Sequence, residues 1–389
     1  MKPEWICLLE DIGTWLAPLK RLGRRTLTLP ATHADLLAQS EALVDALHPR
    51  SMRLRLIETV EETPTTQTLR FDRLDGALPP FRPGQYVSLT VEIGEVKTTR
   101  PYSISSRPGA QHLDLTVKRE PSGFVSPYLL EQAPGWEVTT SGPAGSFVHE
   151  PLRDRGPVVL LSGGSGITPF MSMLRHFAAE GFPAPVHLIH GSREVDDVIF
   201  ESEFTRLSAR HDSFDALSVI SRPPPGYTGP SGHLDADLIS QQVGDIAGAS
   251  FFVCGPNGFI EHVVGQLRSL GAADHAIRRE SFGPPKDVTK MPGWPDHVTA
   301  SDTFKVELVG HDPLPVRAGE PLLVALEREG QSVPALCRTG ECADCRIKLL
   351  SGEVWSLPSA GVREADRARG FVHACVAYAV SDLSVDIGS

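Results

Sequence analysis

The chain has 389 residues, more than one hydrophobic core usually accommodates, and about two to four domains are therefore expected. Hydrophobic residues make up 41% of the sequence and charged residues 22%, which is ordinary for a folded globular protein. The formal net charge of −11 argues against non-specific binding to nucleic acid, because such binding requires a basic surface.

The use of cysteine favours a reducing compartment. Six cysteines are too few for a disulfide scaffold of this length, and four of them lie after residue 336, which favours metal ligation. Glu4, Glu10 and Asp11 interrupt any apolar segment near the start of the chain, so no secretory signal is predicted. No uncharged apolar run is long enough for a transmembrane helix. These features predict a cytoplasmic protein.

Residues 1–50 are predicted to form a short helical N-terminal extension. Apolar residues recur at helical spacing from Trp5 to Leu19, and a second helix is expected to begin at Thr32. We favour a pair of helices that packs on the rest of the chain. The alternative is an element that docks on a partner or contacts a membrane surface.

Short segments of alternating apolar and polar residues follow between residues 51 and 150. Turn signals such as Pro83-Gly84 separate them. Six such strands with regular turns are typical of an antiparallel barrel or sandwich. The predicted strands are RLRLIETV, TQTLRFDR, QYVSLTVE, TTRPYSIS, LDLTVKRE and WEVTTSGP.

Strands and helices alternate in residues 151–282, which predicts a parallel sheet flanked by helices. Residues 283–302 are rich in proline and polar residues and are predicted to be a linker. Residues 303–389 are predicted to form a compact α+β unit. Its strands FKVELVG and PLPVRAG precede a short helix in PLLVALEREG and then a cysteine-rich loop.

The cysteine-rich loop is CRTGECADC, residues 337–345. Cys337, Cys342 and Cys345 have C-x4-C-x2-C spacing, and Cys375 follows further along the chain. This is the spacing of plant-type [2Fe–2S] ferredoxins. Zinc sites also use cysteine, but usually as two C-x2-C pairs, and only one such pair occurs here. Gly340 suits a crowded turn in which the backbone passes close to the cluster. We therefore predict a [2Fe–2S] cluster on these four cysteines.

The predicted cluster implies two further cofactors. Such a cluster takes one electron, whereas NAD(P)H delivers a hydride, which carries two. A flavin can accept the pair and release the electrons one at a time. A flavin site and a nicotinamide site are therefore expected earlier in the chain.

Residues with suitable chemistry for a flavin end one of the predicted barrel strands. In Arg100-Pro101-Tyr102-Ser103 the arginine suits a phosphate, the tyrosine ring suits an isoalloxazine face, and the serine hydroxyl suits a ring nitrogen. Downstream, GFVSP at residues 123–127 is predicted to begin a helix, with Ser126 as its N-cap. A helix N-terminus offers free N–H groups to a pyrophosphate.

R-x-Y-S followed by G-x-x-S on a barrel resembles the flavin domain of the ferredoxin–NADP reductase superfamily. The resemblance implies that Arg100 and Ser126 hold flavin phosphates beside Gly123. It also implies that Tyr102 packs on the flavin and that Ser103 approaches its N5 atom. It favours FAD, while related phthalate-dioxygenase-type reductases leave FMN open. In relatives, an aromatic residue at the position of Phe282 contacts the flavin.

The resemblance extends to the nicotinamide domain. GGSGITP at residues 163–169 is similar to the G-G-x-G-x-T-P motif of the superfamily, with Thr168 predicted as a helix N-cap and Pro169 at the helix start. The C-G-P motif of the family is matched at residues 254–256, which implies that Cys254 lies beside the nicotinamide C4 atom. The implied nicotinamide contacts in these motifs are Gly163, Gly164, Gly166, Thr168, Pro169, Cys254, Gly255 and Pro256.

The nicotinamide cofactor itself is less well defined by the sequence. Ser221-Arg222 resembles the Ser-Arg pair that NADP-selective members use for the 2′-phosphate, and Arg193 is a candidate to assist. NADH-using relatives contain similar sequences. We favour NADPH slightly and leave NADH open.

The resemblance covers residues 53–389 and implies three domains in order. These are an antiparallel β-barrel flavin domain, an α/β Rossmann-like nicotinamide domain and an α+β β-grasp ferredoxin domain. Reductase components of oxygenases and desaturases share this order, phenylacetyl-CoA epoxidase reductase among them. The implied activity is transfer of electrons from NAD(P)H through FAD and the [2Fe–2S] cluster to a partner protein. Arg338, Glu341 and Asp344 are predicted to form the rim that faces this acceptor.

Two alternatives remain at this point. One is a reductase for a non-oxygenase protein, such as a hybrid-cluster protein. The other is a redox sensor or ferredoxin-like carrier with a vestigial flavin domain. The 14 histidines include no clustered His/carboxylate triad, so any oxidation of a substrate is expected to occur on the partner.

Overall fold

The structure is a computed structural model that describes residues 40, 41, 43–358 and 360–388. The chain divides into two compact units, Met1–Ala46 and Leu47–Ser389. In the first unit the described residues are helical, whereas the helices predicted over Trp5–Leu19 and from Thr32 begin outside the described residues. No helix within the described ranges is both long and apolar enough to cross a membrane.

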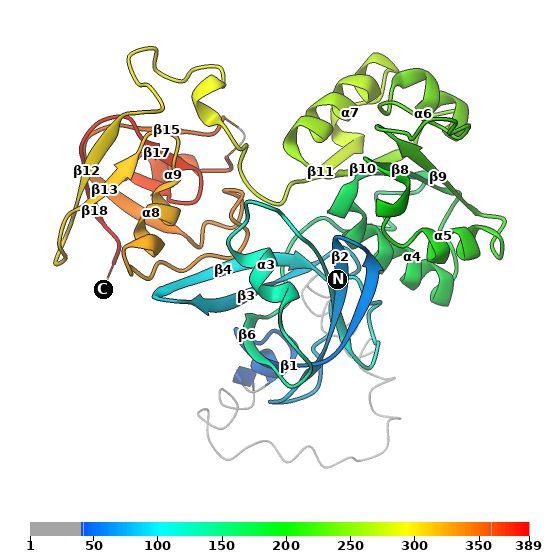
Figure 1. Cartoon of the computed structure of the whole chain (residues 1–389), viewed down its shortest axis with the longest axis horizontal. Coiled ribbons are helices and arrows are strands. Elements are labelled where there is room, and N and C mark those ends of the chain that lie inside the picture. The colour runs from blue at the N-terminus through cyan, green and yellow to red at the C-terminus, as the bar shows by residue number, and fades with distance from the viewer. Residues whose placement is uncertain (1–39, 42, 359, 389) are drawn as a thin grey trace, which may run out of the picture. The chain divides into compact units, whose positions relative to one another are not determined.

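The first part of the larger unit is a six-stranded antiparallel sheet with the strand order β4-β3-β6-β1-β2-β5 (Figure 1). Buried and exposed residues alternate at the start of β1, as expected of a sheet with one face on a core. A bridge between Ile104 and Leu115 joins the two edges of the sheet, so that it curls toward a barrel. The strands are β1 Ser51–Thr63, β2 Thr66–Arg73, β3 Tyr86–Ile93, β4 Val96–Ser103, β5 Leu113–Lys118 and β6 Glu137–Ser141, and a short helix, α3, spans Val125–Leu130.

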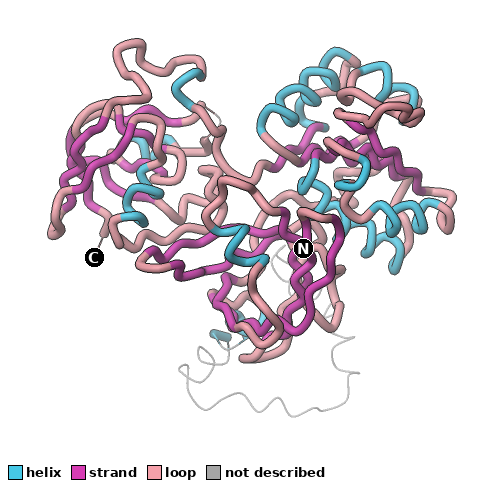
Figure 2. Tube along the Cα trace, viewed as in Figure 1, coloured by secondary structure: helices cyan, strands magenta, loops and turns pink. Residues whose placement is uncertain are grey.

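The second part is a five-stranded parallel sheet with the order β11-β10-β7-β8-β9. Its strands are β7 Val158–Gly163, β8 Val186–Ser192, β9 Phe214–Ile220, β10 Ser250–Cys254 and β11 Ile277–Glu280. Its helices are α4 Thr168–Glu180, α5 Glu201–Ser208, α6 Ala236–Val243 and α7 Asn257–Ser269, with 3-10 turns η2 Gly164–Ile167, η3 Val195–Asp197 and η4 Asp274–Ala276. Figure 2 shows these helices gathered around the strands.

Two separate apolar cores cover the faces of this parallel sheet. Phe170 of α4 and Phe204 of α5 pack with Leu160 on one face, in one core cluster. Ile239 of α6 and Val263 of α7 belong to the cluster on the other face. The chain adds β8 and β9 on one side of β7 and then adds β10 and β11 on the other side. The order of strand addition therefore reverses beside β7. The carboxyl ends of β7 and β10 meet at this switch point, where α/β sheets bind ligands.

The third part is an α+β unit built on a five-stranded sheet of order β13-β12-β18-β14-β16 and a two-stranded sheet of β15 and β17. Only β12 and β18 pair in parallel within the larger sheet, so it is mixed. The elements are β12 Thr303–Leu308, β13 Leu314–Arg317, α8 Leu322–Arg328, β14 Arg346–Ser351, β15 Val354–Ser356, α9 Glu364–Arg367, β16 Phe371–His373, β17 Ala377–Ala379 and β18 Leu383–Asp386. The three predicted fold classes are thus confirmed.

The segment predicted as a linker, residues 283–302, packs on the third part of the chain. It contains a 3-10 turn, η5 Val288–Lys290, and its Val288, Trp294 and Val298 are buried in the same core as α8. The ring of Trp294 lies 5.5 Å from that of Trp355, and its indole N–H donates to the carbonyl of Val298 at 2.9 Å. Burial of these apolar groups explains why a proline-rich stretch holds a fixed path here.

Helix α4 is also held against the flavin sheet. The hydroxyl of Ser172 donates to the carbonyl of Ser106 at 2.7 Å, and Arg175 donates to the carbonyl of Ser105 at 2.8 Å. Arg175 also forms an ion pair with Glu203 of α5. The residues after β4 are therefore connected directly to the helix that follows β7.

Candidate functional site

The cysteine-rich loop lies between α8 and β14, and its three thiols form two pairs together with the thiol of Cys375, which follows β16. The thiol of Cys337 interacts with that of Cys342, and the thiol of Cys345 with that of Cys375. Each iron of a [2Fe–2S] cluster takes two of the four thiolates, so two pairs suit two irons. In the part of the chain that the structure describes, no three His, Cys, Asp or Glu side chains converge so as to hold a single metal ion.

Backbone groups of the loop are directed at the first of these sulfurs. The N–H groups of Thr339 and Cys342 each lie 3.4 Å from Cys337 Sγ. Together with the Cys342 thiol, which contributes most, they lower the pKa of the Cys337 thiol. A lowered pKa favours the thiolate, which is the form that binds metal. The donor set therefore fits a cluster.

The loop needs an unusual backbone to direct these groups inward. Arg338, Gly340 and Ala343 have φ values of 56°, 84° and 62°, all in the left-handed region. A Cβ atom on Gly340 would lie 2.8 Å from Val376, so this position requires glycine for space as well as for conformation. The carbonyl of Gly340 accepts a hydrogen bond from the imidazole of His373, whose Nδ1 lies 2.8 Å away.

Three residues were predicted to lie exposed on the rim that faces the acceptor. Two of them are exposed and the third is buried. Glu341 and Asp344 are exposed, as is the ligand Cys342. Arg338 is buried, because its guanidinium forms an ion pair with Glu327 of α8 and donates to Thr98 of β4 at 3.0 Å. Its side chain thus points toward the flavin sheet and not toward solvent.

A cavity of about 920 Å³ brings together the residues predicted for flavin and nicotinamide. Predicted residues from both domains line it, and this volume is of the size that cofactor pockets have. The predicted residues on its wall are Arg100, Tyr102, Ser103, Gly123, Ser126, Thr168, Arg193, Arg222 and Phe282.

Arg100 is positioned on this wall by β4 itself. Its Nη1 donates to the carbonyl of Thr99 at 2.9 Å and to the hydroxyl of Thr98, and it lies 3.8 Å from the carboxylate of Glu327. Burial, followed by the charge of Arg338, lowers the pKa of Arg100 to about 10. Arg100 therefore remains a cation at neutral pH and suits an anionic phosphate in the cavity.

Both predicted helix caps are wrong in detail. Helix α3 begins at Val125 after Phe124, and the hydroxyl of Ser126, already inside the helix, accepts the N–H of Glu120 at 3.0 Å. Helix α4 begins at Thr168, whose hydroxyl donates to the carbonyl of Ser165 at 2.9 Å. In both cases the hydroxyl bonds to a residue before the helix, and neither helix has a side-chain cap.

Two of the glycines at the end of β7 and in the η2 turn allow close approach to neighbouring elements, Gly166 to the end of β10 and Gly163 to α7. A Cβ atom on Gly166 would lie 2.1 Å from the carbonyl oxygen of Cys254, and one on Gly163 would lie 2.9 Å from the ring of Phe259. Gly164, with φ of 55°, has open space beside it. Among these three glycines it is therefore the one that steric crowding does not require.

Several predicted nicotinamide residues lie behind the cavity wall. Cys254 is fully buried, and this burial raises the pKa of its thiol. The hydroxyl of Ser221 donates to the carbonyl of Ser192 at 3.3 Å, while the backbone N–H of Arg222 donates to the carbonyl of Arg193 at 2.8 Å. The predicted residues absent from the cavity wall are Gly163, Gly164, Gly166, Pro169, Ser221, Cys254, Gly255 and Pro256.

A second, much smaller cavity of about 20 Å³ connects the flavin wall to the cluster loop. Ser103, Phe282 and Cys337 line it together with Glu280, which was not predicted as a site residue. Burial, followed by the charge of Glu341, raises the pKa of Glu280 to about 8. Its position at the carboxyl end of β11, two residues before Phe282, was a usable signal, because α/β sheets bind ligands at such ends.

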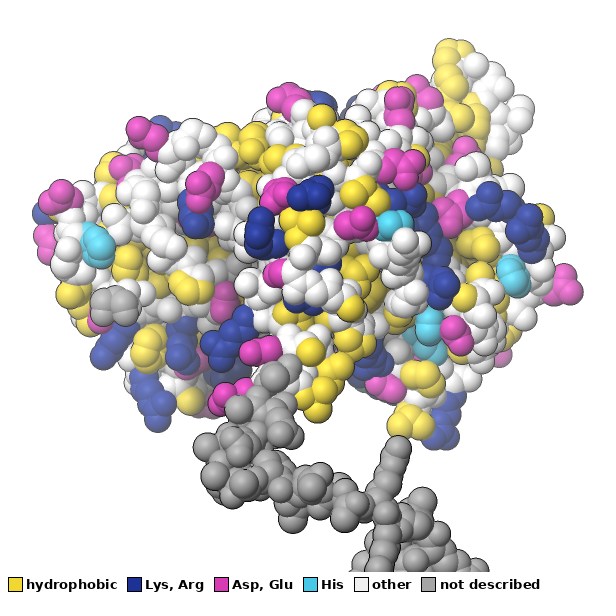
Figure 3. All heavy atoms as spheres, turned by 90° about the horizontal axis from the view of Figure 1, so that it is seen from below, with side chains coloured by type: hydrophobic (Ala, Val, Ile, Leu, Met, Phe, Trp, Pro, Cys, Tyr) yellow, Lys and Arg dark blue, Asp and Glu magenta, His cyan; other side chains and the backbone are white. Residues whose placement is uncertain are grey.

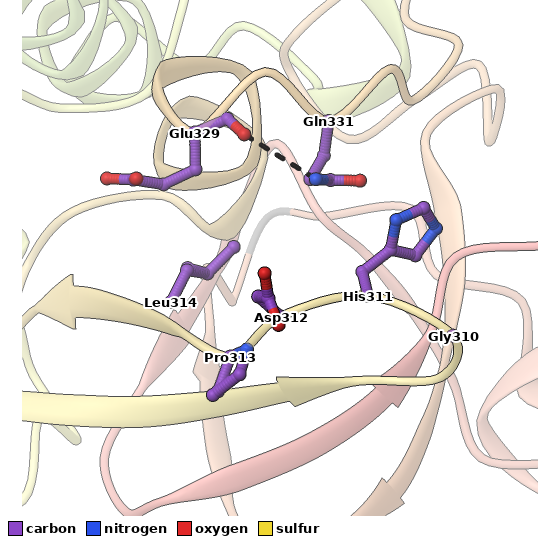
Figure 4. Close-up of a pocket in the computed structure, with 7 residues that line it drawn as sticks. All are labelled: Gly310, His311, Asp312, Pro313, Leu314, Glu329 and Gln331. Carbon is purple, nitrogen blue, oxygen red and sulfur yellow. Dashed lines mark hydrogen bonds between the residues drawn. The ribbon is translucent and has the colours of Figure 1, made fainter.

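Two further hollows lie apart from the large cavity. One, of about 620 Å³, lies beside Cys342 and is lined by Arg153, His275 and Arg279. The other, of about 640 Å³, lies on the ferredoxin-like part between the β12–β13 turn and the end of α8 (Figure 4). His311, Asp312, Glu329 and Gln331 line it, and it contains none of the predicted site residues.

Three family models match consecutive parts of the chain. They describe an oxidoreductase FAD-binding domain at residues 53–149, an oxidoreductase NAD-binding domain at residues 160–265 and a 2Fe-2S iron-sulfur cluster binding domain at residues 312–380. The glycine betaine monooxygenase reductase subunit of Chromohalobacter salexigens is 30% identical over 349 residues, which are 86% of this chain and 94% of that protein. The chain belongs to this family of flavin and iron–sulfur oxidoreductases.

Further relatives agree with this assignment. The NADPH oxidoreductase of Mycobacterium tuberculosis is 31% identical over 376 residues, 95% of this chain and 92% of that protein. The solved structure of phthalate dioxygenase reductase, 23% identical, covers 86% of this chain and 98% of its own, with a TM-score of 0.64, and so supports the fold. The reductase therefore uses NAD(P)H, a flavin and a [2Fe–2S] cluster, as predicted.

Cys342→Ser is expected to abolish the rhombic electron paramagnetic resonance signal of the dithionite-reduced reductase, since the cluster loses one of its four thiolates. Cys254→Ser is the matched control, because Cys254 is a buried thiol outside the loop. The signal should survive in the control. An unchanged signal in Cys342→Ser would contradict the assignment of this ligand.

The raised pKa of Glu280 predicts a pH dependence of stability. Between pH 4.5 and 8 the folded chain holds a proton on Glu280 that the unfolded chain releases, so the free energy of unfolding falls as the pH rises through this window. Glu280→Gln removes this contribution. Relative to the variant, the wild type should become less stable as the pH rises through this window, measured by urea unfolding at several pH values. Parallel stability profiles would refute the raised pKa, and Glu364→Gln on the exposed α9 is the control.

Proposed function

We propose that this reductase transfers electrons from NADPH to the terminal oxygenase component of a multi-protein oxygenase. The observation that carries the proposal is the continuity of the site: Ser103 lines both the large cavity and the small cavity that contains Cys337. This shared lining supports a route from nicotinamide to flavin to cluster within one chain. The name of the Chromohalobacter relative, a monooxygenase reductase subunit, supports an oxygenase as the acceptor.

Each residue has a separate task in this proposal. Arg100 binds a flavin phosphate, the ring of Tyr102 supports the isoalloxazine, and Ser103 presents its hydroxyl at the reacting edge. Phe282, which is 40% exposed, covers the cavity and must move when the nicotinamide enters. A bound flavin would accept the two electrons of a hydride and release them one at a time. The chain contributes orientation and the exclusion of water.

The proposed role of Cys254 requires a change in its position, which the sequence did not indicate. Its thiol is buried in the core between β10 and α4 and does not line the cavity. The backbone around Gly255 must shift before the thiol can approach a nicotinamide ring. We therefore assign Cys254 a role only in the nucleotide-bound state.

Electron delivery from the cluster is proposed to occur at Cys342, the exposed ligand. Glu341 and Asp344 lie beside it, and Arg153 and Arg279 line the adjacent hollow, so the partner surface is expected to carry both basic and acidic residues there. Basic and acidic side chains are otherwise interspersed on the face of the molecule shown in Figure 3.

We further propose a cytoplasmic location and a packing role for residues 1–50, with contact to a membrane surface as the alternative for that segment.

The proposed function predicts different electron acceptors for the two redox groups. The purified, cofactor-loaded reductase should reduce ferricyanide and cytochrome c with NADPH, and Cys342→Ser should lose cytochrome c reduction while keeping ferricyanide reduction at the flavin. Addition of an oxygenase component encoded nearby should couple NADPH oxidation to oxygen consumption. No turnover with either nucleotide would reject the reductase, whereas turnover without coupling to any oxygenase would favour a non-oxygenase acceptor such as a hybrid-cluster protein.

Arg222 is predicted to select NADPH by binding the 2′-phosphate, with Arg193 beside it on the cavity wall. Arg222→Ser should lower kcat/KM for NADPH by about tenfold to a hundredfold and leave kcat/KM for NADH nearly unchanged, because a charge-assisted bond is lost only with the phosphorylated nucleotide. Steady-state ferricyanide reduction measures both values. An equal loss with the two nucleotides would mean that Arg222 does not contact the phosphate. Arg210→Ser, an exposed arginine after α5, is the control.

A further inference from the structure

The residues on either side of the ligand Cys337 are both bonded to the flavin sheet. Before it, the carbonyl of Leu336 accepts a hydrogen bond from the hydroxyl of Ser88 of β3 at 3.0 Å. After it, the guanidinium of Arg338 donates to the hydroxyl of Thr98 of β4 at 3.0 Å. Strands β3 and β4 are paired, so two adjacent strands hold one short stretch of the cluster loop. Cys337 is therefore fixed with respect to the flavin wall.

The carboxylate of Glu327 completes this attachment from α8. One oxygen accepts the guanidinium of Arg338, and the other accepts the hydroxyl of Thr98 at 2.9 Å. Both charged side chains are less than one-tenth exposed. A buried carboxylate requires such partners, since its unpaired charge would be strongly unfavourable in the interior. Loss of Arg338 would leave Glu327 with Thr98 and the more distant Arg100, and loss of Glu327 would leave two arginines without their shared carboxylate.

The network reaches the flavin site through Arg100. Arg100 donates to Thr98 and lies 3.8 Å from Glu327, so one carboxylate faces two arginines. The group of three charged residues carries one net positive charge. Arg100 also lines the large cavity, where an anionic phosphate would balance that charge. The flavin ligand and the cluster loop therefore share one set of hydrogen bonds.

The backbone conformation of Arg338 is unfavourable, which indicates that this arrangement has a functional role. A left-handed arginine, with φ of 56°, is unfavourable, and its buried Nε has no hydrogen bond partner in the described structure. Packing between the domains alone does not require an arginine in this conformation next to a cluster ligand. Strain of this kind persists where the surroundings fix a functional geometry.

We propose that Arg338 and Glu327 are positioning residues that hold Cys337 against the flavin cavity and thereby set the rate at which electrons pass from flavin to cluster. The inference rests on the proposed function. NADPH would supply two electrons as hydride to the bound flavin, and the step considered is the passage of one of them to the oxidised cluster. The second electron would follow only after the cluster has passed the first to the external acceptor. Arg338 and Glu327 do not line the large cavity and reach the flavin site only through Arg100, so their loss should affect hydride transfer from NADPH to the flavin less than transfer from flavin to cluster.

The test uses anaerobic single-turnover kinetics of the cofactor-loaded full chain with NADPH, following flavin and cluster absorbance separately. In Arg338→Met and Glu327→Gln the rate of flavin reduction should change by no more than about twofold, because Arg100 keeps its bonds to Thr98 and Thr99. Their flavin-to-cluster transfer should fall roughly tenfold or more, because small displacements of reacting groups are costly. Arg338→Lys should recover part of the rate. The exposed Arg369→Met is the matched control and should transfer electrons at the wild-type rate.

A second readout does not depend on activity. Amide hydrogen exchange in β4 and in residues 336–341 should be faster in Arg338→Met and Glu327→Gln than in Arg369→Met, because the shared hydrogen bonds are lost. Wild-type transfer rates in both variants, with an intact cluster signal, would overturn the inference even if exchange changes, since the contacts would then only join the domains.

If Arg338→Met fails to load its cluster, Thr98→Val decides the question. It removes one hydroxyl that lies outside the cluster loop, and slow flavin-to-cluster transfer in this variant would support the inference while a wild-type rate would overturn it. A wild-type chain whose flavin is reduced while its cluster stays oxidised would reject the proposed function as well. Wild-type transfer with unimpaired variants would reject only the positioning role.

Discussion

The buried carboxylate of Glu327 is the interaction on which the electron path depends. It is the single anion between Arg338, which follows the first cluster ligand, and Arg100, which lines the flavin cavity. Because a buried charge is tolerated only with its partners present, the carboxylate of Glu327 depends on these arginines. The contact between the two domains therefore fixes the position of Cys337. A surface ion pair, which contributes little, could not do so.

The nicotinamide domain is also held against the flavin domain by specific close contacts. Gly166 allows the turn after β7 to pass within van der Waals contact of the Cys254 carbonyl, and α4 is then tied to the residues after β4 by Ser172 and Arg175. The switch point of the parallel sheet is thereby presented to the flavin wall. The large cavity results from this attachment, since neither domain alone contributes all of its lining.

Much of this organisation could be predicted from the sequence, and the failures have physical causes. The cysteine spacing, the six barrel strands and the strand–helix alternation depend on local pattern, and they were correct. The burial of Arg338 could not be predicted, because its partners Thr98 and Glu327 are distant in sequence and an arginine between cysteines resembles a surface residue. The caps at Ser126 and Thr168 failed because preceding turns supply their partners. Glu280 was missed because its raised pKa arises from burial, which only the fold reveals.

The loop separates the entry of electrons from their exit. Cys337 is buried on the cavity that contains Ser103 and Phe282, whereas Cys342, five residues later, is exposed beside Glu341 and Asp344. Since the network of Glu327 engages only the buried side, an acceptor can bind the exposed side without disturbing the attachment to the flavin sheet. The left-handed residues Arg338, Gly340 and Ala343 produce this reversal within nine residues. The backbone that directs N–H groups at the sulfurs therefore also divides the loop into a donor side and an acceptor side.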